Sequence, residues 1–238
     1  SDRLAHIGPE RASFPIDSGR LEMSRSECTA IMRSAAPLPP DEVVHPWLSR
    51  VGGTFGRWLG REVLHGGAFV VDGRAWALLG GAGAGKSTLL AILARKRHDV
   101  LTDDVLVMHN GLVFAGPRCV DLRPDAAATV GMKDALPVRG GTRRRVELPR
   151  SAAAVPLGGI VHLDWGAHAE ARPVPLDQRI ARLRAQAWLG VHDPIGKSAL
   201  LELVAVPTLE LLRPRRENAL ATGAAVLLDA VRGYTGRP

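Results

Sequence analysis

Hydrophobic and polar residues form their clearest pattern in the middle of the chain. Two β-rich runs, Ala68–Val71 and Arg74–Leu79, flank the dipeptide Asp72-Gly73. Because glycine adopts the positive φ that a tight turn needs, Asp-Gly between apolar runs predicts a β-hairpin. The second run leads into a glycine-rich segment, Gly80–Gly85, and an apolar pattern of helical period follows over Lys86–Arg97. The pattern therefore predicts a hairpin, a loop and a helix in succession.

A second hairpin is expected shortly after that helix. Val105–Met108 and Leu112–Ala115 flank Asn110-Gly111, and a short strand at Val100–Leu101 precedes them and ends at Asp103-Asp104. Hairpins join antiparallel strands, so two of them argue against a purely parallel sheet. We therefore predict an α/β fold with a mixed sheet that contains antiparallel hairpins and is flanked by helices.

The pattern is weaker toward both ends of the chain. Before residue 45 we expect short strands and one short helix around Ser26–Ser34. Asp41 could cap a helix that runs through Val44 to Leu48, although Pro46 favours a short or broken one. The strands predicted later in the chain are Cys119–Leu122, Arg145–Leu148, Gly159–Leu163 and Val204–Leu212, and the helices are Leu176–Leu189 and Asn218–Val231.

Composition places the chain among ordinary globular proteins. Of its 238 residues, 46% are hydrophobic and 23% charged, which excludes a largely disordered chain, a collagen and a coiled coil. The sequence contains no internal repeat. We expect residues 1–60 to be an extension packed on a core domain of residues 61–238. The apolar runs are shorter than the ~18 residues of a membrane span. Cys28 and Cys119 lack metal-ligand spacing, so we expect free thiols in a cytoplasmic protein that has no membrane partner.

The chain is strongly basic, with a formal net charge of +7. Only four of the 31 basic residues are lysines, and the others are arginines. An excess of this size can indicate an anionic partner such as a nucleotide, a nucleic acid or an acidic peptide. It can equally reflect an arginine-rich coding bias on a solvated surface. The tryptophans are dispersed and no nucleic-acid-binding motif is present, so we expect no nucleic-acid partner.

The glycine-rich segment carries the most specific motif. Residues 80–87 read Gly-Gly-Ala-Gly-Ala-Gly-Lys-Ser and match G-x-x-x-x-G-K-[ST] at every fixed position. Backbone N–H groups of such a loop and the helix N-terminus point at phosphate oxygens. We expect Lys86 to reach the β/γ-phosphates and the Ser87 hydroxyl to coordinate Mg²⁺. The predicted nucleotide-binding residues are Gly80, Gly81, Ala82, Gly83, Ala84, Gly85, Lys86, Ser87 and Thr88.

A pair of carboxylates, Asp103-Asp104, follows Lys86 by 17 and 18 residues. The C-terminal end of a strand beside a phosphate loop is where a Mg²⁺ ligand or a base belongs. Adjacent residues on a strand point to opposite faces, so at most one of the pair should face the γ-phosphate, unless the strand ends between them. The alternative is a pair of turn or helix-cap residues. No motif of a GTPase, a transporter ATPase or a eukaryotic-type protein kinase is present.

Three motifs in a fixed order extend this interpretation. Leu64-His65-Gly66 stands before the first hairpin, Val100-Leu101-Thr102-Asp103-Asp104 follows the helix, and Asp121-Leu122-Arg123-Pro124 comes next. Together they resemble the catalytic domain of the bacterial HPr kinase/phosphorylase family, in which the last two motifs read Val-Ala-Asp-Asp and Glu-Leu-Arg-Gly. The resemblance covers roughly residues 62–125 and continues weakly to Leu163. It implies an HPr-kinase-like P-loop domain that uses ATP and Mg²⁺ to phosphorylate a serine hydroxyl.

The resemblance also implies roles for individual residues. By position, Asp104 looks like the general base, Asp103 its partner near the metal, and His65 a group near the active site, although His65 alone is more often structural. The implied catalytic residues are Asp104, Asp103, His65 and Lys86, and the implied metal ligands are Ser87, Asp103 and Asp121. Substrate or phosphate contacts are expected from Arg123, Arg145 and Arg150.

The resemblance also suggests a class of acceptor. Only about 60 residues precede the motifs, whereas full-length members of the family carry a large N-terminal domain. The chain looks more like shorter relatives that phosphorylate a peptide, including the C-terminal Ser of lasso-peptide precursors. We expect a kinase of a Ser/Thr hydroxyl on a peptide or protein, and the resemblance suggests a homo-oligomer. The alternatives are a P-loop ATPase, a small-molecule kinase and a non-catalytic nucleotide sensor.

Overall fold

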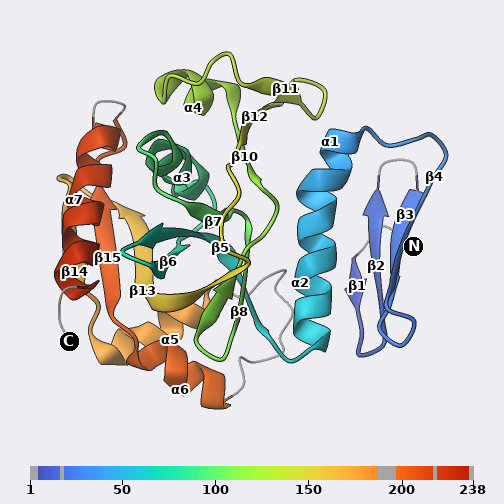
Figure 1. Cartoon of the computed structure of the whole chain (residues 1–238), viewed down its shortest axis with the longest axis horizontal. Coiled ribbons are helices and arrows are strands. Elements are labelled where there is room, and N and C mark those ends of the chain that lie inside the picture. The colour runs from blue at the N-terminus through green and yellow to red at the C-terminus, as the bar shows by residue number, and fades with distance from the viewer. Residues whose placement is uncertain (1–4, 17–18, 187–196, 217–218, 236–238) are drawn as a thin grey trace.

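The computed structural model describes residues 5–16, 19–186, 197–216 and 219–235, and its largest sheet has eight strands (Figure 1). These are β5 (Glu62–Val71), β6 (Arg74–Leu79), β7 (Val100–Thr102), β8 (Val105–His109), β9 (Leu112–Phe114), β13 (Ala154–Trp165), β14 (Glu170–Pro173) and β15 (Thr208–Arg213). The order is β14-β15-β13-β6-β5-β8-β9, with β7 paired to β5. Strand β13 is parallel to β6 and β15, whereas β5 is antiparallel to β6 and β8. The predicted mixed α/β fold is confirmed.

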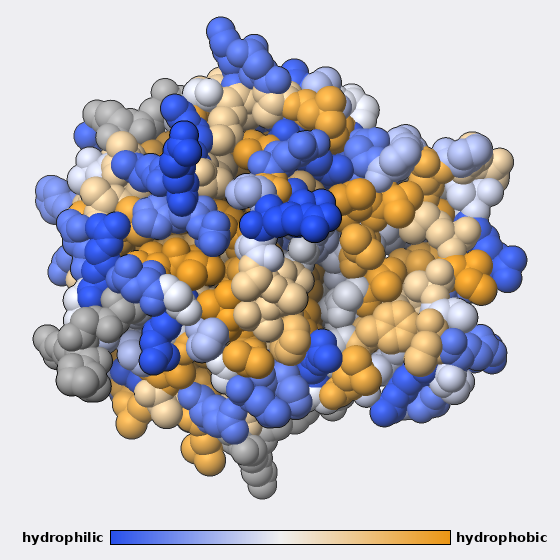
Figure 2. Space-filling model, viewed as in Figure 1, coloured by the Kyte–Doolittle hydropathy of each residue, from blue (hydrophilic) through white to orange (hydrophobic). Residues whose placement is uncertain are grey.

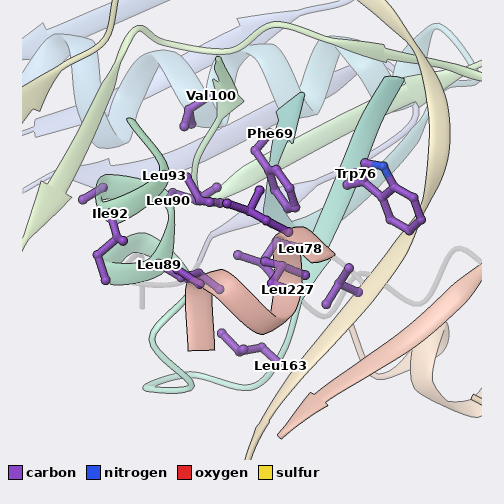
Figure 3. Packing of buried hydrophobic residues seen from close by; sticks show 14 of the residues in the cluster. Phe69, Trp76, Leu78, Leu89, Leu90, Ile92, Leu93, Val100, Leu163 and Leu227 are labelled. Atoms are coloured by element: carbon purple, nitrogen blue, oxygen red, sulfur yellow. The ribbon is translucent and has the colours of Figure 1, made fainter. Parts of the chain in front are cut away.

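Alternation of side chains along β6 produces a core on each face of this sheet. The covering helices are α3 (Lys86–Arg95), α5 (Leu176–Arg184), α6 (Lys197–Ala205) and α7 (Ala219–Thr235). Trp76 and Leu78 pack in one core with residues of α3 and with Leu227 of α7 (Figure 3). Ala77 and Leu79 pack on the other face with α5 and α6. The sheet is therefore covered on both sides, which explains why β6 is apolar at nearly every position.

The N-terminal residues form a second, four-stranded antiparallel sheet. Its strands are β1 (His6–Ile7), β2 (Arg11–Ile16), β3 (Gly19–Ser24) and β4 (Thr29–Ser34). Phe14 and Leu21 are fully buried and pack with Trp58 of helix α2 (Leu48–Trp58). The predicted helix around Ser26–Ser34 is wrong, because Thr29–Ser34 pairs along β3 and Met32 packs on this cluster. The division at residue 60 stays a prediction.

Helix α2 connects the two sheets. It packs against β5 and β8, where Gly56 approaches the side chains of Val63 and Val107. A short helix α1 (Pro40–Glu42) and the segment η1 (Val43–Trp47) precede it, and the helical path is interrupted inside η1 at His45, whose φ of −149° and ψ of 125° are extended. The expected break at Pro46 is confirmed, because the residue before it, His45, is extended and separates the helical turns on its two sides. Hydrophobic groups are exposed over this part of the molecule (Figure 2). Leu48, the first residue of α2, is 50% exposed.

A small third sheet follows the main hairpins, in the order β10-β12-β11. Its strands are β10 (Cys119–Leu122), β11 (Leu136–Val138) and β12 (Arg143–Glu147), and helix α4 (Pro124–Thr129) lies between the first two along the chain. The predicted strand Cys119–Leu122 is confirmed, whereas α4 and β11 were not predicted. Both are short, and short elements carry little periodic signal.

Two predicted elements in the last third need correction. The apolar positions Leu176, Ile180 and Leu183 recur at helical spacing and predict one buried face of α5. In the structure Leu183 is 1% exposed but Leu176 and Ile180 are 63% and 38% exposed, so that face is only partly buried. The predicted end of that helix, 187–189, lies outside the described residues. Val204, expected in a strand, belongs to α6, and the strand itself is Thr208–Arg213. An apolar run of this length fits either a buried helix or a strand, and only packing distinguishes them.

Two further expectations concern cysteines and membranes. Cys28 is exposed, Cys119 is buried, and both are free thiols as expected. Among the described residues, every helix is too short or too polar to cross a bilayer.

Candidate functional site

The predicted phosphate loop joins the end of β6 to the start of α3. Gly83 and Gly85 have φ values of +78° and +83°, in the region that favours glycine. A Cβ at Gly85 would also lie 2.2 Å from Nη2 of Arg213. Glycine is therefore required at position 85 both by the backbone and by the side chain packed against it.

Lys86 crosses the opening of this loop. Its side chain is buried, and Nζ donates to the carbonyl oxygens of Gly80 at 2.7 Å and Gly81 at 3.3 Å. Burial lowers the pKa of Lys86, while the nearby carboxylates of Asp103 and Asp104 act in the opposite direction. The ammonium is thus held against the loop backbone, where a compact point charge suits phosphate.

Asp103 lies behind the loop and is 6% exposed. Its carboxylate accepts a hydrogen bond from Ser87, and its Oδ1 has no partner. Burial raises the pKa of Asp103 to about 6, and the charge of Asp104 adds to the effect. A serine hydroxyl beside an unpartnered carboxylate oxygen is a donor set suited to Mg²⁺, a cation that prefers oxygen and shares its shell with phosphate and water. Ser87 and Asp103 therefore fit the implied ion.

Asp104 occupies the turn between β7 and β8. Its φ of +71° is left-handed, and β7 ends at Thr102, before both aspartates. The alternation of an extended strand therefore does not apply, and Asp103 and Asp104 line the same cleft. His65 Nδ1 lies 3.0 Å from the carbonyl oxygen of Asp104 and 3.5 Å from its Oδ1. Because a carbonyl accepts, Nδ1 is assigned the proton.

The surroundings of His65 hold the pKa of its imidazole below the ordinary value. Burial lowers its pKa, the charge of Lys86 adds to the effect, and Asp104 opposes it. More than a third of the side-chain surface of His65, and of Asp104, is exposed to solvent. The pair therefore faces the open part of the cleft, where a second substrate could enter.

The cleft around these groups has a volume of about 490 Å³. Of the predicted residues, those that line it are His65, Ala82, Gly83, Gly85, Lys86, Ser87, Thr88, Asp103, Asp104, Asp121 and Arg123. Gly80, Gly81 and Ala84 instead line a second cavity of about 390 Å³ on the other side of the loop. The structure thus brings His65 and Arg123 to one cleft, although they are 58 residues apart in the chain.

Asp121 and Arg145 bind one another. Arg145 donates from Nε to Oδ1 at 2.7 Å and from Nη2 to Oδ2 at 2.8 Å, and the side chains are 7% and 2% exposed. Both carboxylate oxygens accept a hydrogen bond from Arg145, so each charge of the pair is balanced within the protein. The Mg²⁺ role of Asp121 and the phosphate role of Arg145 stay predictions. Arg150 is exposed and lies outside the set of residues that line the cleft.

The sequence interpretation missed the far wall of the cleft. Trp165 at the end of β13 and Arg213 at the end of β15 both line it, together with Arg215 and Arg216. The guanidinium of Arg213 lies 4.4 Å from the centre of the Trp165 ring. A signal was available, because a cluster of arginines follows a predicted strand and ligands bind at the carboxyl ends of parallel strands.

Comparisons with known proteins add a structural likeness. No family model matches the chain, and no curated protein matches it. Among solved structures, it is similar to the HPr(Ser) kinase/phosphatase from Coxiella burnetii, with 12% identity and a TM-score of 0.38. The match covers 74% of this chain and 99% of that one. A likeness of this size leaves the function to the geometry of the cleft itself.

Proposed function

We propose that the protein is an ATP-dependent kinase that transfers the γ-phosphoryl group to a Ser or Thr hydroxyl of a peptide or protein. One observation carries the proposal. The carboxylate of Asp104 and the phosphate loop with Lys86 line one open cleft, and the buried Asp103 lies beside Ser87 behind them. This combines a base, a phosphate cradle and a metal-binding pair, which is what phosphoryl transfer requires.

The proposed roles follow from these positions. The loop N–H groups and Lys86 bind the β- and γ-phosphates, and Ser87 and Asp103 would hold Mg²⁺, which neutralises phosphate charge when bound. Asp104 takes the proton of the acceptor hydroxyl while that oxygen bonds to the γ-phosphorus and the bond to the β-phosphate oxygen breaks. His65 Nδ1–H donates to the carbonyl of Asp104 and holds the left-handed turn that presents the carboxylate.

A peptide acceptor is supported by the open side of the cleft. His65 and Asp104 are partly exposed there, and the arginines Arg123 and Arg143 line the same opening. Guanidinium groups suit an acidic or phosphorylated segment. The resemblance of the motifs to compact peptide kinases makes a lasso-peptide precursor with a C-terminal Ser the first candidate substrate. Homo-oligomer formation and a cytoplasmic location stay predictions.

The test is transfer of labelled γ-phosphate from Mg·ATP to peptides, including a lasso-peptide precursor and its C-terminal Ser→Ala form. We expect Asp104→Asn to lose transfer by about 100-fold or more, the scale of general-base catalysis, and to retain ATP binding. Lys86→Ala should lose ATP binding itself. The control is Asp134→Asn, because Asp134 is exposed and lies outside the cleft.

Four outcomes would contradict the proposal in different ways. A normal transfer rate in Asp104→Asn would remove the assigned base. A labelled metabolite in the absence of labelled peptide would indicate a small-molecule kinase. Release of labelled phosphate alone would indicate an ATPase. Binding of ATP without any turnover would indicate a nucleotide sensor.

A further inference from the structure

Arg213 lies at the end of β15 and has a buried guanidinium. It belongs to none of the motifs identified in the sequence. Its side chain is 0% exposed. Nη2 donates to the carbonyl oxygen of Ala84 at 2.6 Å, so the residue is attached to the phosphate loop. Its Nε and Nη1 are buried and have no hydrogen-bond partner. Two donors of a charged group are therefore left unsatisfied beside the loop.

No carboxylate balances this charge within the described residues. Arg213 takes part in no ion pair among the described residues, and its guanidinium lies against the ring of Trp165. Burial lowers the pKa of Arg213 to about 10, so the group is still a cation at neutral pH. Arg145 shows the usual arrangement, because that buried guanidinium is matched by Asp121. An unmatched buried charge is costly, so it needs a compensating anion.

The position of Arg213 indicates where that anion binds. Its Nη2 would lie 2.2 Å from a Cβ at Gly85, the residue that precedes the helix and Lys86. Strands β6, β13 and β15 are parallel, so their carboxyl ends meet at Leu79, Trp165 and Arg213 beside the loop. Arg213 also lines the cleft that contains the loop. In a low-dielectric surrounding its charge acts on the loop with little screening.

We propose that Arg213 is a built-in counter-charge for the pyrophosphate moiety of a nucleotide bound in the phosphate loop. The inference rests on the proposed function for the nucleotide, but it requires no phosphoryl transfer. Two consequences separate this role from a structural one. Removing the charge weakens binding of the anion, and it leaves the ligand-free protein no less stable, because an unmatched buried charge disappears with it.

The experiment measures binding of pyrophosphate and of Mg·ATP to the full chain by calorimetry, together with the melting temperature of the ligand-free protein. We expect Arg213→Met to bind pyrophosphate at least tenfold more weakly, with a melting temperature equal to or above that of the wild type. Arg213→Lys keeps the charge and should bind within about threefold. The matched control is Arg33→Met, which removes an exposed arginine far from the cleft on β4.

Two results would overturn the inference. One is a folded Arg213→Met protein that binds pyrophosphate within twofold of the wild type. The other is equal weakening in Arg213→Met and Arg213→Lys with a lowered melting temperature, which would show that the residue only supports the loop.

If Arg213→Met does not fold, the wild-type chain decides the question. The Nε–H signal of Arg213 is identified as the arginine signal that is absent from the NMR spectrum of Arg213→Lys. In the wild-type spectrum this signal must shift when pyrophosphate is added, and an unchanged signal would exclude the proposed role. Failure of the kinase proposal would appear as a normal transfer rate in Asp104→Asn or as the absence of labelled peptide. These transfer assays are separate from the pyrophosphate titrations and melting temperatures of the Arg213 variants, so the two failures are distinguishable.

Discussion

Arg145 donates two hydrogen bonds to Asp121, and its Nη2 donates a third to the carbonyl oxygen of Asp41 at 2.9 Å. The hydrogen bond to Asp121 raises the pKa of Arg145. One guanidinium therefore ties β12 to β10 and to the helical segment that leads into α2. The pair is buried, and a buried pair is most sensitive to the loss of a single partner.

We accordingly expect Asp121→Asn to lower the free energy of unfolding by about 3 kcal/mol, the scale for an uncompensated buried charge. Urea unfolding at pH 7 measures this. The control is Glu22→Gln, which breaks the exposed pair with Arg33 and should cost below about 1 kcal/mol. Equal effects of the two substitutions would show that the buried pair has no special weight.

Gly85 and Gly81 provide a matched pair in the phosphate loop. An alanine at 85 would adopt an unfavourable positive φ and place its Cβ against Arg213, whereas a Cβ at Gly81 meets nothing within 4 Å. We expect Gly85→Ala to weaken nucleotide binding by at least tenfold and Gly81→Ala to change it by less than threefold. Calorimetric titration with Mg·ATP distinguishes them, and similar affinities for both variants would refute the geometric argument.

His65 is expected to position Asp104 without itself taking the proton. On the proposed kinase activity, His65→Phe should lower kcat by about 10- to 100-fold, with little change in the KM for ATP. This loss lies at or below the lower limit of about 100-fold for a group that itself transfers the proton, because His65 acts through Asp104. His65→Gln should recover part of the rate, since an amide N–H can still donate to the Asp104 carbonyl. If Gln were as slow as Phe, the hydrogen bond would have no part in catalysis.

Asp103 should make the ligand-free protein less stable as pH rises. Burial raises its pKa to about 6 from an ordinary value of 3.8. The native state therefore binds more protons than the unfolded state between these values, so this residue's contribution to stability falls as pH rises through that window. The full loss is about 3 kcal/mol and levels off above pH 6.

Asp103→Asn removes that contribution. The difference in free energy of unfolding between Asp103→Asn and the wild type should therefore grow in favour of the variant from pH 4 to pH 6 and stay constant from pH 7 to pH 8. Urea unfolding at each pH provides the measurement. A difference that does not vary with pH would mean that the carboxyl titrates normally.

Local signals explain which elements could be predicted. Strand Arg74–Leu79 matches its predicted bounds, because an Asp-Gly turn and a glycine-rich loop mark its two ends. The helix expected around Ser26–Ser34 failed for the opposite reason. The local sequence carries no signal for the pairing of Thr29–Ser34 with β3. That pairing places Met32 against the hydrophobic cluster that contains Trp58.

The sequence by itself determined the phosphate loop, since the positive-φ glycines, Lys86 and the helix start are contiguous and act through the local backbone. Only the tertiary structure decided which charges are available to a ligand. Asp121 is bound by Arg145, 24 residues away, and Arg213 reaches Ala84 across 129 residues without a carboxylate partner among the described residues. Such pairings depend on strand order and burial, which bring distant side chains together, and no local pattern encodes them.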